Sequence, residues 1–149
     1  MEVWERPGAG PVIESKSILL LEDDVEFTDA LTALLEIQNY YVKVVHRGVD
    51  GLREVIACDF DVIICDMVMP GLPGDMFYLA VQKLKPHLCS RFLFITGHRE
   101  APSVSSFFTK VKQPILNKPL TLEDLLHEIL NLLMEQESEP NVQLCVASS

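Results

Sequence analysis

Short runs of Ile, Leu and Val alternate along this chain with amphipathic segments, and this alternation limits the possible folds more than any other feature. The runs at residues 18–21, 62–65 and 92–95 are continuously apolar and short, as strands buried on both faces are. The segments between them carry apolar residues at helical spacing, as Phe27 and Leu31 do. Strands that alternate with helices indicate βαβ units around a parallel sheet.

We therefore expect an α/β fold with a doubly wound five-stranded parallel sheet and helices on both faces, since right-handed crossovers place helices on each side. The strands are predicted at 17–22, 41–45, 61–65, 91–96 and 111–117, and the helices at 27–35, 49–57, 76–85, 101–109 and 121–133. Pro114 removes a backbone donor from the last strand, which suits the sheet edge. We expect one domain over residues 17–134, an N-terminal arm over 1–16 and a C-terminal tail over 135–149.

The composition excludes several classes of function. Twelve Lys and Arg residues against 22 Asp and Glu residues give a net charge of −10, which repels nucleic acid and anionic lipid. Apolar runs stay far below the roughly 18 residues of a membrane helix, and the N-terminus lacks the pattern of a secretory signal. We therefore expect a cytoplasmic protein. The four cysteines have no C-x-x-C spacing, so we expect neither zinc nor disulfides.

Polar residues end or follow four of the five predicted strands. They are Glu22 at the end of the first strand with Asp23 and Asp24 after it, Asp66 after the third, Thr96 at the end of the fourth and Lys118 after the fifth. Each alone has a structural explanation, since acids favour a helix N-terminus and a threonine can end a strand. Together they indicate a chemical site, because ligands of such sheets bind beyond the carboxyl ends of the strands.

Crowded carboxylates repel one another unless a cation neutralises them. The donors here are all oxygens, which suits Mg²⁺ better than zinc or copper, and Mg²⁺ leaves coordination places for a phosphate oxygen. Asp66 stands alone at the end of the central strand and is our candidate nucleophile toward a phosphoryl group. Lys118 then serves as a point charge on the phosphoryl oxygens and Thr96 as a hydrogen-bond donor to them.

The motifs ILLLEDD, VIICDMVMPGLPG, FLFITGH and ILNKPL stand in this order along the chain. In sequence and spacing they resemble the receiver domain of two-component response regulators, over residues 17–134. The resemblance implies a flavodoxin-like sheet with the strand order 2-1-3-4-5, which is the order of this family. It also implies a Lys118–Pro119 bond that is often cis.

Carried over residue by residue, the resemblance implies a complete phosphorylation site. Asp66 is the phosphoacceptor, Thr96 the switch hydroxyl and Lys118 the phosphate-contacting lysine. Mg²⁺ is held by Asp23, Asp66 and the backbone carbonyl of Val68, with Glu22 as the second member of the acidic pair. Asp24 is a third acid without an essential role.

The resemblance also implies how such a chain signals. A sensor histidine kinase or histidine phosphotransfer protein supplies the phosphoryl group, and the face of the fourth helix, fifth strand and fifth helix changes. The chain slowly loses its own phosphoryl group and is not a turnover enzyme. Ile115 occupies the position where many receivers carry a switching aromatic residue, which argues against a tyrosine-type readout.

The output of such a chain must pass to another molecule. About fifteen residues follow the last predicted helix, so we expect a stand-alone receiver that signals to a separate protein target, along a relay or by forming a homodimer. The Leu-rich last helix, together with Phe107 and Phe108, is our candidate for the partner surface, although core packing would account for these residues equally well.

Two other classes of protein remain open as alternatives. A pseudoreceiver has the same fold and binds partners without being phosphorylated. A haloacid-dehalogenase-type phosphatase also uses a strand-end aspartate with Mg²⁺, but it needs a second acid two residues later, where this chain has Val68. A flavodoxin fits least, since no Ser- or Thr-rich phosphate loop follows the first strand.

Overall fold

The computed structural model describes residues 15–97 and 99–138, so most of the expected N-terminal arm, His98 and the end of the expected tail lie outside the described residues. The described chain has five strands, five α-helices and one 3-10 helix. In chain order these are β1 (Ser17–Leu21), α1 (Val25–Ile37), β2 (Tyr41–Val45), α2 (Gly48–Ala57), β3 (Val62–Asp66), α3 (Gly74–Leu84), η1 (Pro86–Arg91), β4 (Phe92–Thr96), α4 (Pro102–Phe108), β5 (Ile115–Asn117) and α5 (Leu122–Ser138).

All strand pairs are parallel, and the strand order is β2-β1-β3-β4-β5, which confirms the predicted topology. The order reverses at β1, because the chain runs outward to β2 and then returns to β3 on the other side. In sheets of this kind a crevice opens beyond the carboxyl ends of the strands where the order reverses. The residues that follow β1 and β3 therefore face each other there.

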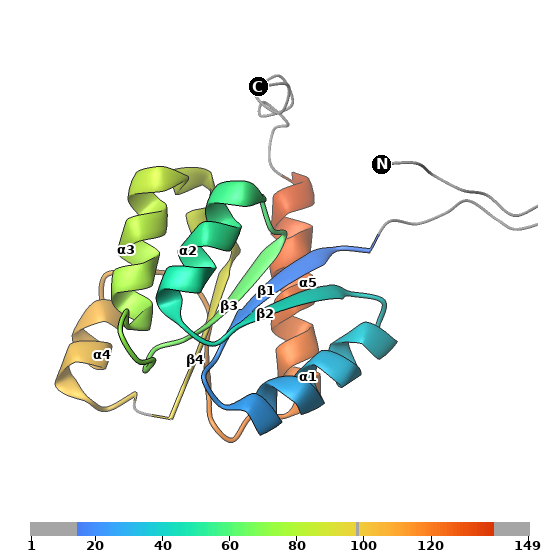
Figure 1. The fold of residues 1–149 in the computed structure, drawn as a ribbon, viewed down its shortest axis with the longest axis horizontal. Helices are drawn as coiled ribbons and strands as arrows, with labels where there is room; N and C mark the ends of the chain where they lie inside the picture. The colour runs from blue at the N-terminus through green and yellow to red at the C-terminus, as the bar shows by residue number, and fades with distance from the viewer. Residues whose placement is uncertain (1–14, 98, 139–149) are drawn as a thin grey trace, which may run out of the picture.

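Successive strand residues point to opposite faces of the sheet, so each strand contributes to two separate cores. On one face Ile18, Leu20 and their neighbours pack against α1 and α5, and on the other Leu19 and Leu21 pack against α2, α3 and α4. Figure 1 shows these two helical layers with the sheet between them. Burial on both faces explains why the strands read as unbroken apolar runs.

Several elements differ in extent from the sequence prediction. The 3-10 helix η1 was not predicted, and β5 has three residues and begins after Pro114, whereas the predicted strand contained this proline. Helix α5 continues to Ser138, four residues past the expected end of the folded domain. Its first turn is capped by Thr121, whose hydroxyl accepts a hydrogen bond from the Asp124 amide at 3.1 Å.

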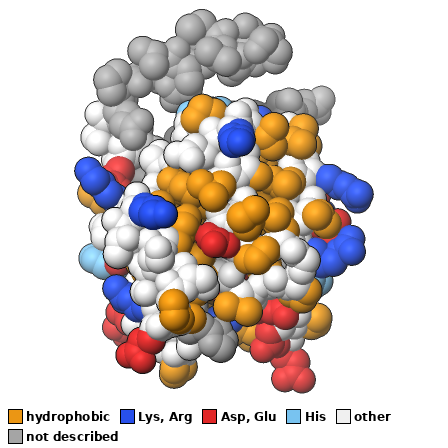
Figure 2. Space-filling view, turned by 90° about the vertical axis from the view of Figure 1, so that its left-hand side faces the viewer, with side chains coloured by type: hydrophobic (Ala, Val, Ile, Leu, Met, Phe, Trp, Pro, Cys, Tyr) orange, Lys and Arg blue, Asp and Glu red, His pale blue; other side chains and the backbone are white. Residues whose placement is uncertain are grey.

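Apolar side chains gather on the face of the molecule that carries α3 and α4 (Figure 2). A groove between these helices is lined by side chains that include Leu79 and Phe107. Most of the Phe107 side chain belongs to the core, where its ring packs edge-on against those of Tyr78 and Phe94. Of the two interpretations that the sequence leaves open for Phe107, the structure therefore favours core packing.

No helix in the described ranges is long and apolar enough to cross a membrane.

The fold predicts a strong effect of a methyl group at Gly74, where α3 begins against the end of β3. A Cβ atom there would lie 2.5 Å from the Asp66 carbonyl oxygen and 2.8 Å from Met67 Cα, both of them backbone atoms. We expect Gly74→Ala to lower the free energy of unfolding by about 1 to 3 kcal/mol in urea denaturation, because the loop after Asp66 must shift. Gly97→Ala is the control, since its Cβ would meet only Lys118 Cβ at 3.9 Å. Equal stability of the two variants would contradict this account.

Candidate functional site

The parallel strands end at one edge of the sheet and carry the predicted site residues there. Asp66 is the last residue of β3 and Thr96 the last of β4, while Glu22 and Lys118 each follow a strand directly. Main-chain hydrogen bonds tie this edge together: the Glu22 amide donates to Val45 O at 3.1 Å and the Lys118 amide to Thr96 O at 2.9 Å. The peptide bond between Lys118 and Pro119 is cis, as the resemblance implied.

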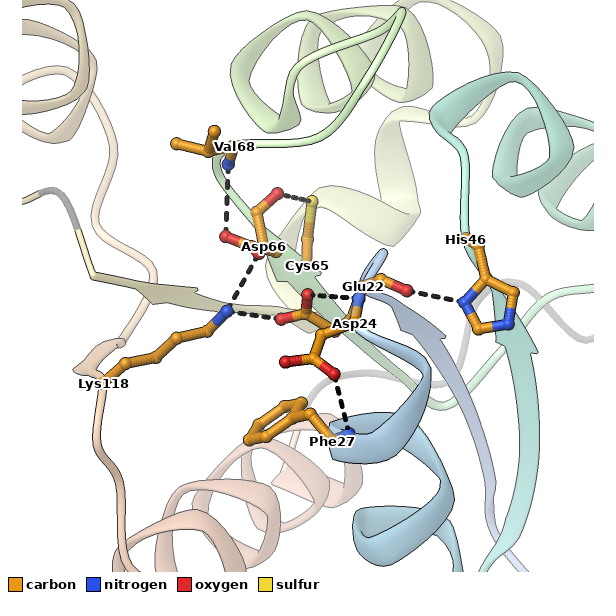
Figure 3. A network of polar contacts seen from close by, with 8 residues as sticks. All are labelled: Glu22, Asp24, Phe27, His46, Cys65, Asp66, Val68 and Lys118. Carbon is orange, nitrogen blue, oxygen red and sulfur yellow. Dashed lines mark hydrogen bonds and ion pairs between the residues drawn. The ribbon is translucent and has the colours of Figure 1, made fainter.

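The Lys118 ammonium group links the two sides of the site (Figure 3). Its Nζ donates to Glu22 Oε1 and, at 3.0 Å, to Asp66 Oδ2. Both carboxylates are almost fully buried, with 1% and 5% of their side-chain surface exposed. Burial alone would lower the pKa of Lys118, but the hydrogen bonds and charges of the two carboxylates outweigh it and raise this pKa. The lysine is therefore held in its charged form between them.

Every polar atom of Glu22 has a partner. Besides Lys118, the side chain accepts a hydrogen bond from the Asp24 amide at 3.0 Å, and the Glu22 carbonyl oxygen lies 2.9 Å from His46 Nδ1. With the bond from the Glu22 amide to Val45 O, four groups fix this residue. Glu22 is thus a rigid member of the site, although sequence reasoning assigned it only as the second acid beside the metal.

Glu22, Asp23 and Asp66 form the acidic cluster of the site, since each offers a carboxylate oxygen and these oxygens lie within 4.8 Å of one another. Hydrogen bonding with the Glu22 side chain, burial and the charge of Glu22 together raise the pKa of Asp23. Unlike Glu22 and Asp66, which are buried, Asp23 is exposed to solvent. A donor set made only of oxygen atoms, with an unfavourable concentration of negative charge, fits a hard divalent cation such as Mg²⁺.

Val68 and Thr96 complete the surroundings of Asp66. The Val68 amide donates to Asp66 Oδ1 at 3.1 Å, so each Asp66 oxygen accepts one hydrogen bond, and the Val68 side chain stays about half exposed at 47%. Thr96 is fully buried and lines a hollow of about 470 Å³ together with Gly97, Asn117 and Lys118. The structure thus brings all the sequence-predicted site residues to one edge.

Three contacts were not foreseen from the sequence. Asp24, expected as a third acid, caps α1 by accepting a hydrogen bond from the Phe27 amide at 3.1 Å. The Phe27 ring lies below the Lys118 ammonium group, 5.2 Å from its centroid, which is a cation–π contact. His46, which sequence reasoning left without a role, contacts the Glu22 main chain. An aspartate just before an amphipathic helix is an N-cap signal, but the two ring contacts have no sequence signal.

The comparisons with known proteins agree with this geometry. The model of the response regulator receiver domain matches residues 18–130. The receiver protein CpdR of Brucella abortus is 29% identical over 119 residues, which are 80% of this chain and 98% of CpdR. A CheY-like receiver structure from Methanospirillum hungatei superposes with a TM-score of 0.76 at 26% identity, over 85% of this chain and 99% of that one.

This chain therefore belongs to the response regulator receiver domain family of two-component signal transduction. Receiver domains are signalling modules that work through phosphorylation and are generally not turnover enzymes. The chain spans only part of other curated relatives: 13% of a sensor kinase of Brucella abortus and 52% of a tetrathionate response regulatory protein of Salmonella typhimurium. The fold is also that of a sensor kinase receiver domain from Pseudomonas aeruginosa, described with a magnesium ion in its active-site cleft, at a TM-score of 0.73, 19% identity and coverage of 80% and 98%.

The Lys118 ion pairs predict the effect of removing the Lys118 ammonium group. In Lys118→Met, the buried Glu22 and Asp66 carboxylates lose their shared partner, so we expect a loss of about 2 kcal/mol in the free energy of unfolding without metal. Mg²⁺ should restore part of this loss by supplying positive charge. Lys118→Arg retains the charge and serves as the control. Urea denaturation with and without Mg²⁺ measures both effects, and unchanged stability of Lys118→Met would refute the account.

The raised pKa of Asp23 predicts that its negative charge destabilises the folded protein in a pH-dependent way. The folded protein binds a proton on Asp23 more tightly than the unfolded chain does, so stability falls as pH rises from the ordinary value of 3.8 through the raised pKa. At neutral pH without metal, Asp23→Asn should therefore raise the free energy of unfolding by roughly 0.5 kcal/mol, a value discounted for solvent screening. Below pH 3.8 the gain should vanish.

The control for Asp23→Asn is Asp24→Asn, since asparagine still caps α1. Urea denaturation at the two pH values measures the gain, and Asp23→Asn should show it where Asp24→Asn does not. A loss of stability in Asp23→Asn at neutral pH would contradict the charge repulsion.

Proposed function

We propose that this chain is a phosphorylation-controlled receiver in which Asp66 accepts a phosphoryl group in the presence of Mg²⁺. The observation that carries the proposal is the position of the Asp66 carboxylate. Lys118 holds one of its oxygens and the Val68 amide holds the other. Two further acids, Glu22 and Asp23, lie beside it in the acidic cluster. A buried carboxylate with a cation and further acids beside it is suited to receive a phosphoryl group and to bind the metal that accompanies it.

The proposed reaction is a transfer to the Asp66 carboxylate. A carboxylate oxygen attacks phosphorus, an acyl phosphate bond forms, and the bond from phosphorus to the nitrogen of a donor phosphohistidine breaks. Lys118 and the Thr96 hydroxyl then neutralise and bind the phosphoryl oxygens. Gly97 leaves room for the phosphoryl group to approach, because even an added Cβ there would meet only one side chain, at 3.9 Å.

Asp23, Asp66 and the Val68 carbonyl are the proposed ligands of Mg²⁺, with Glu22 as the second acid. When bound, the ion offsets negative charge on the phosphoryl oxygens. The protein supplies the other contributions: Lys118 offsets the repulsion between Glu22 and Asp66, and the Val68 amide orients Asp66. Sensor histidine kinases or histidine phosphotransfer proteins are the proposed donors, since the family works in two-component systems.

The proposed output surface is the face of α4, β5 and α5. The Lys118 amide is hydrogen-bonded to Thr96 O, so a shift of either side chain toward a phosphoryl group acts directly on the ends of β4 and β5. The outer side of α5 next to the segment before β5 is hollowed, and Met134 there is 65% exposed. Ile115, at the position of the usual aromatic residue, is partly buried against the core that contains Phe94 and Phe107. A rotamer switch of a tyrosine is therefore not part of this proposal.

Phosphorylation of Asp66 can be tested by the intact mass of the protein after incubation with acetyl phosphate. We expect one phosphoryl group to be added in wild-type protein with Mg²⁺, and none when EDTA removes the metal or in Asp66→Asn. The matched control is Asp75→Asn, because Asp75 is an acid at the start of α3 outside the acidic cluster. Absence of any addition to folded wild-type protein would favour a pseudoreceiver that binds partners independently of phosphate.

A further inference from the structure

We infer that His46 is a positioning residue for the metal site, acting through the main chain of Glu22. The ring stands at the end of β2, on the side of Glu22 away from Asp66 and Lys118 (Figure 3). Its Nδ1 lies 2.9 Å from the Glu22 carbonyl oxygen. A carbonyl oxygen can only accept, so Nδ1 carries the proton and donates it. This inference rests on the proposed use of Asp23 as a Mg²⁺ ligand.

The hydrogen bond from His46 fixes the peptide unit that leads into Asp23. The Glu22 carbonyl and the Asp23 amide belong to one planar peptide. A carbonyl held in one orientation therefore also fixes the orientation of the Asp23 N–H and the position of the Asp23 Cα. The preceding peptide is fixed as well, since the Glu22 amide donates to Val45 O. Two successive residues, Val45 at the end of β2 and His46 after it, thus hold both peptides of Glu22.

Asp23 depends on this support more than the other two acids do. Glu22 is anchored by Lys118 and by the Asp24 amide, and Asp66 by Lys118 and the Val68 amide. The exposed Asp23 carboxylate instead lies beside the Glu22 carboxylate, with oxygens of the two groups within 4.8 Å of each other. Because two like charges repel, this neighbour does not anchor Asp23, and the position of Asp23 depends on the backbone that carries it. Groups that orient metal ligands without touching the metal typically contribute 10- to 100-fold in affinity.

The test compares two substitutions at the same position. His46→Leu fills similar space without a donor, whereas His46→Asn places an amide N–H at the branch position of Nδ1 and keeps the bond. We expect the Kd for Mg²⁺ to rise about tenfold in His46→Leu, the low end for such groups, and to stay near the wild-type value in His46→Asn. His127→Leu, which removes a histidine from α5, far along the chain from the acidic cluster, should bind as wild type does.

Two readouts separate positioning from a general loss of structure. Mg²⁺ titrations followed by the NMR amide resonances of Asp23 and Asp24 give the Kd, and urea denaturation shows whether each variant stays folded. With acetyl phosphate as donor, His46→Leu should need more Mg²⁺ but reach the wild-type rate at saturation.

A wild-type Kd in His46→Leu would overturn the inference while leaving the proposed function intact. Equal weakening in His46→Asn and His46→Leu would also overturn it, because the hydrogen bond would then not be the cause. If wild-type resonances did not respond to Mg²⁺ at all, the metal part of the proposed function would fail, and this inference with it.

Discussion

The Lys118 ammonium group between the carboxylates of Glu22 and Asp66 is the interaction on which the carboxyl edge of the sheet depends. Lys118 and Glu22 are 96 residues apart, so they meet only because β1, β3 and β5 all end at this edge. Without a cation there, two almost fully buried carboxylates would face each other in a medium of low polarity. One ammonium group beside three acids still leaves an excess of negative charge, which a divalent cation would balance.

The backbone around Asp66 is as constrained as its side chain. The Met67 amide donates to Ile95 O in β4, and the Gly74 amide at the start of α3 donates back to Met67 O. The loop between β3 and α3 therefore folds closely over the strand end, at a distance that excludes a side chain at Gly74. Asp66 is positioned by the packing of two elements, and the loop leaves the half-exposed Val68 at the surface.

Sequence reasoning predicted the sheet well because the strands are buried on both faces, and short unbroken apolar runs are typical of such strands. It missed η1, since a short 3-10 helix has no hydrophobic period, and it made β5 too long because Val111 resembles a strand residue. The candidate site residues were predicted to lie together from their places at strand ends, and the structure places them at one edge of the sheet. The contact of His46 with Glu22 was not found, because the partner atom is a backbone carbonyl oxygen, which no sequence pattern encodes. The apolar character of Phe107 was recognised, but only the cluster of rings around Tyr78 and Phe94 shows that it belongs to the core.

Under the proposed function, a phosphoryl group on Asp66 would compete with Glu22 for Lys118. The new group carries more negative charge than the carboxylate it modifies, so it attracts the ammonium group strongly. Glu22 would lose its cation but is held by its main chain and by the Asp24 amide, so it cannot follow. Lys118 is the partner free to move, and it stands one residue after a three-residue strand that pairs on one side only, with β4. Such a short edge strand resists displacement less than the central strands do, which explains why a change at Asp66 would reach α5 through β5.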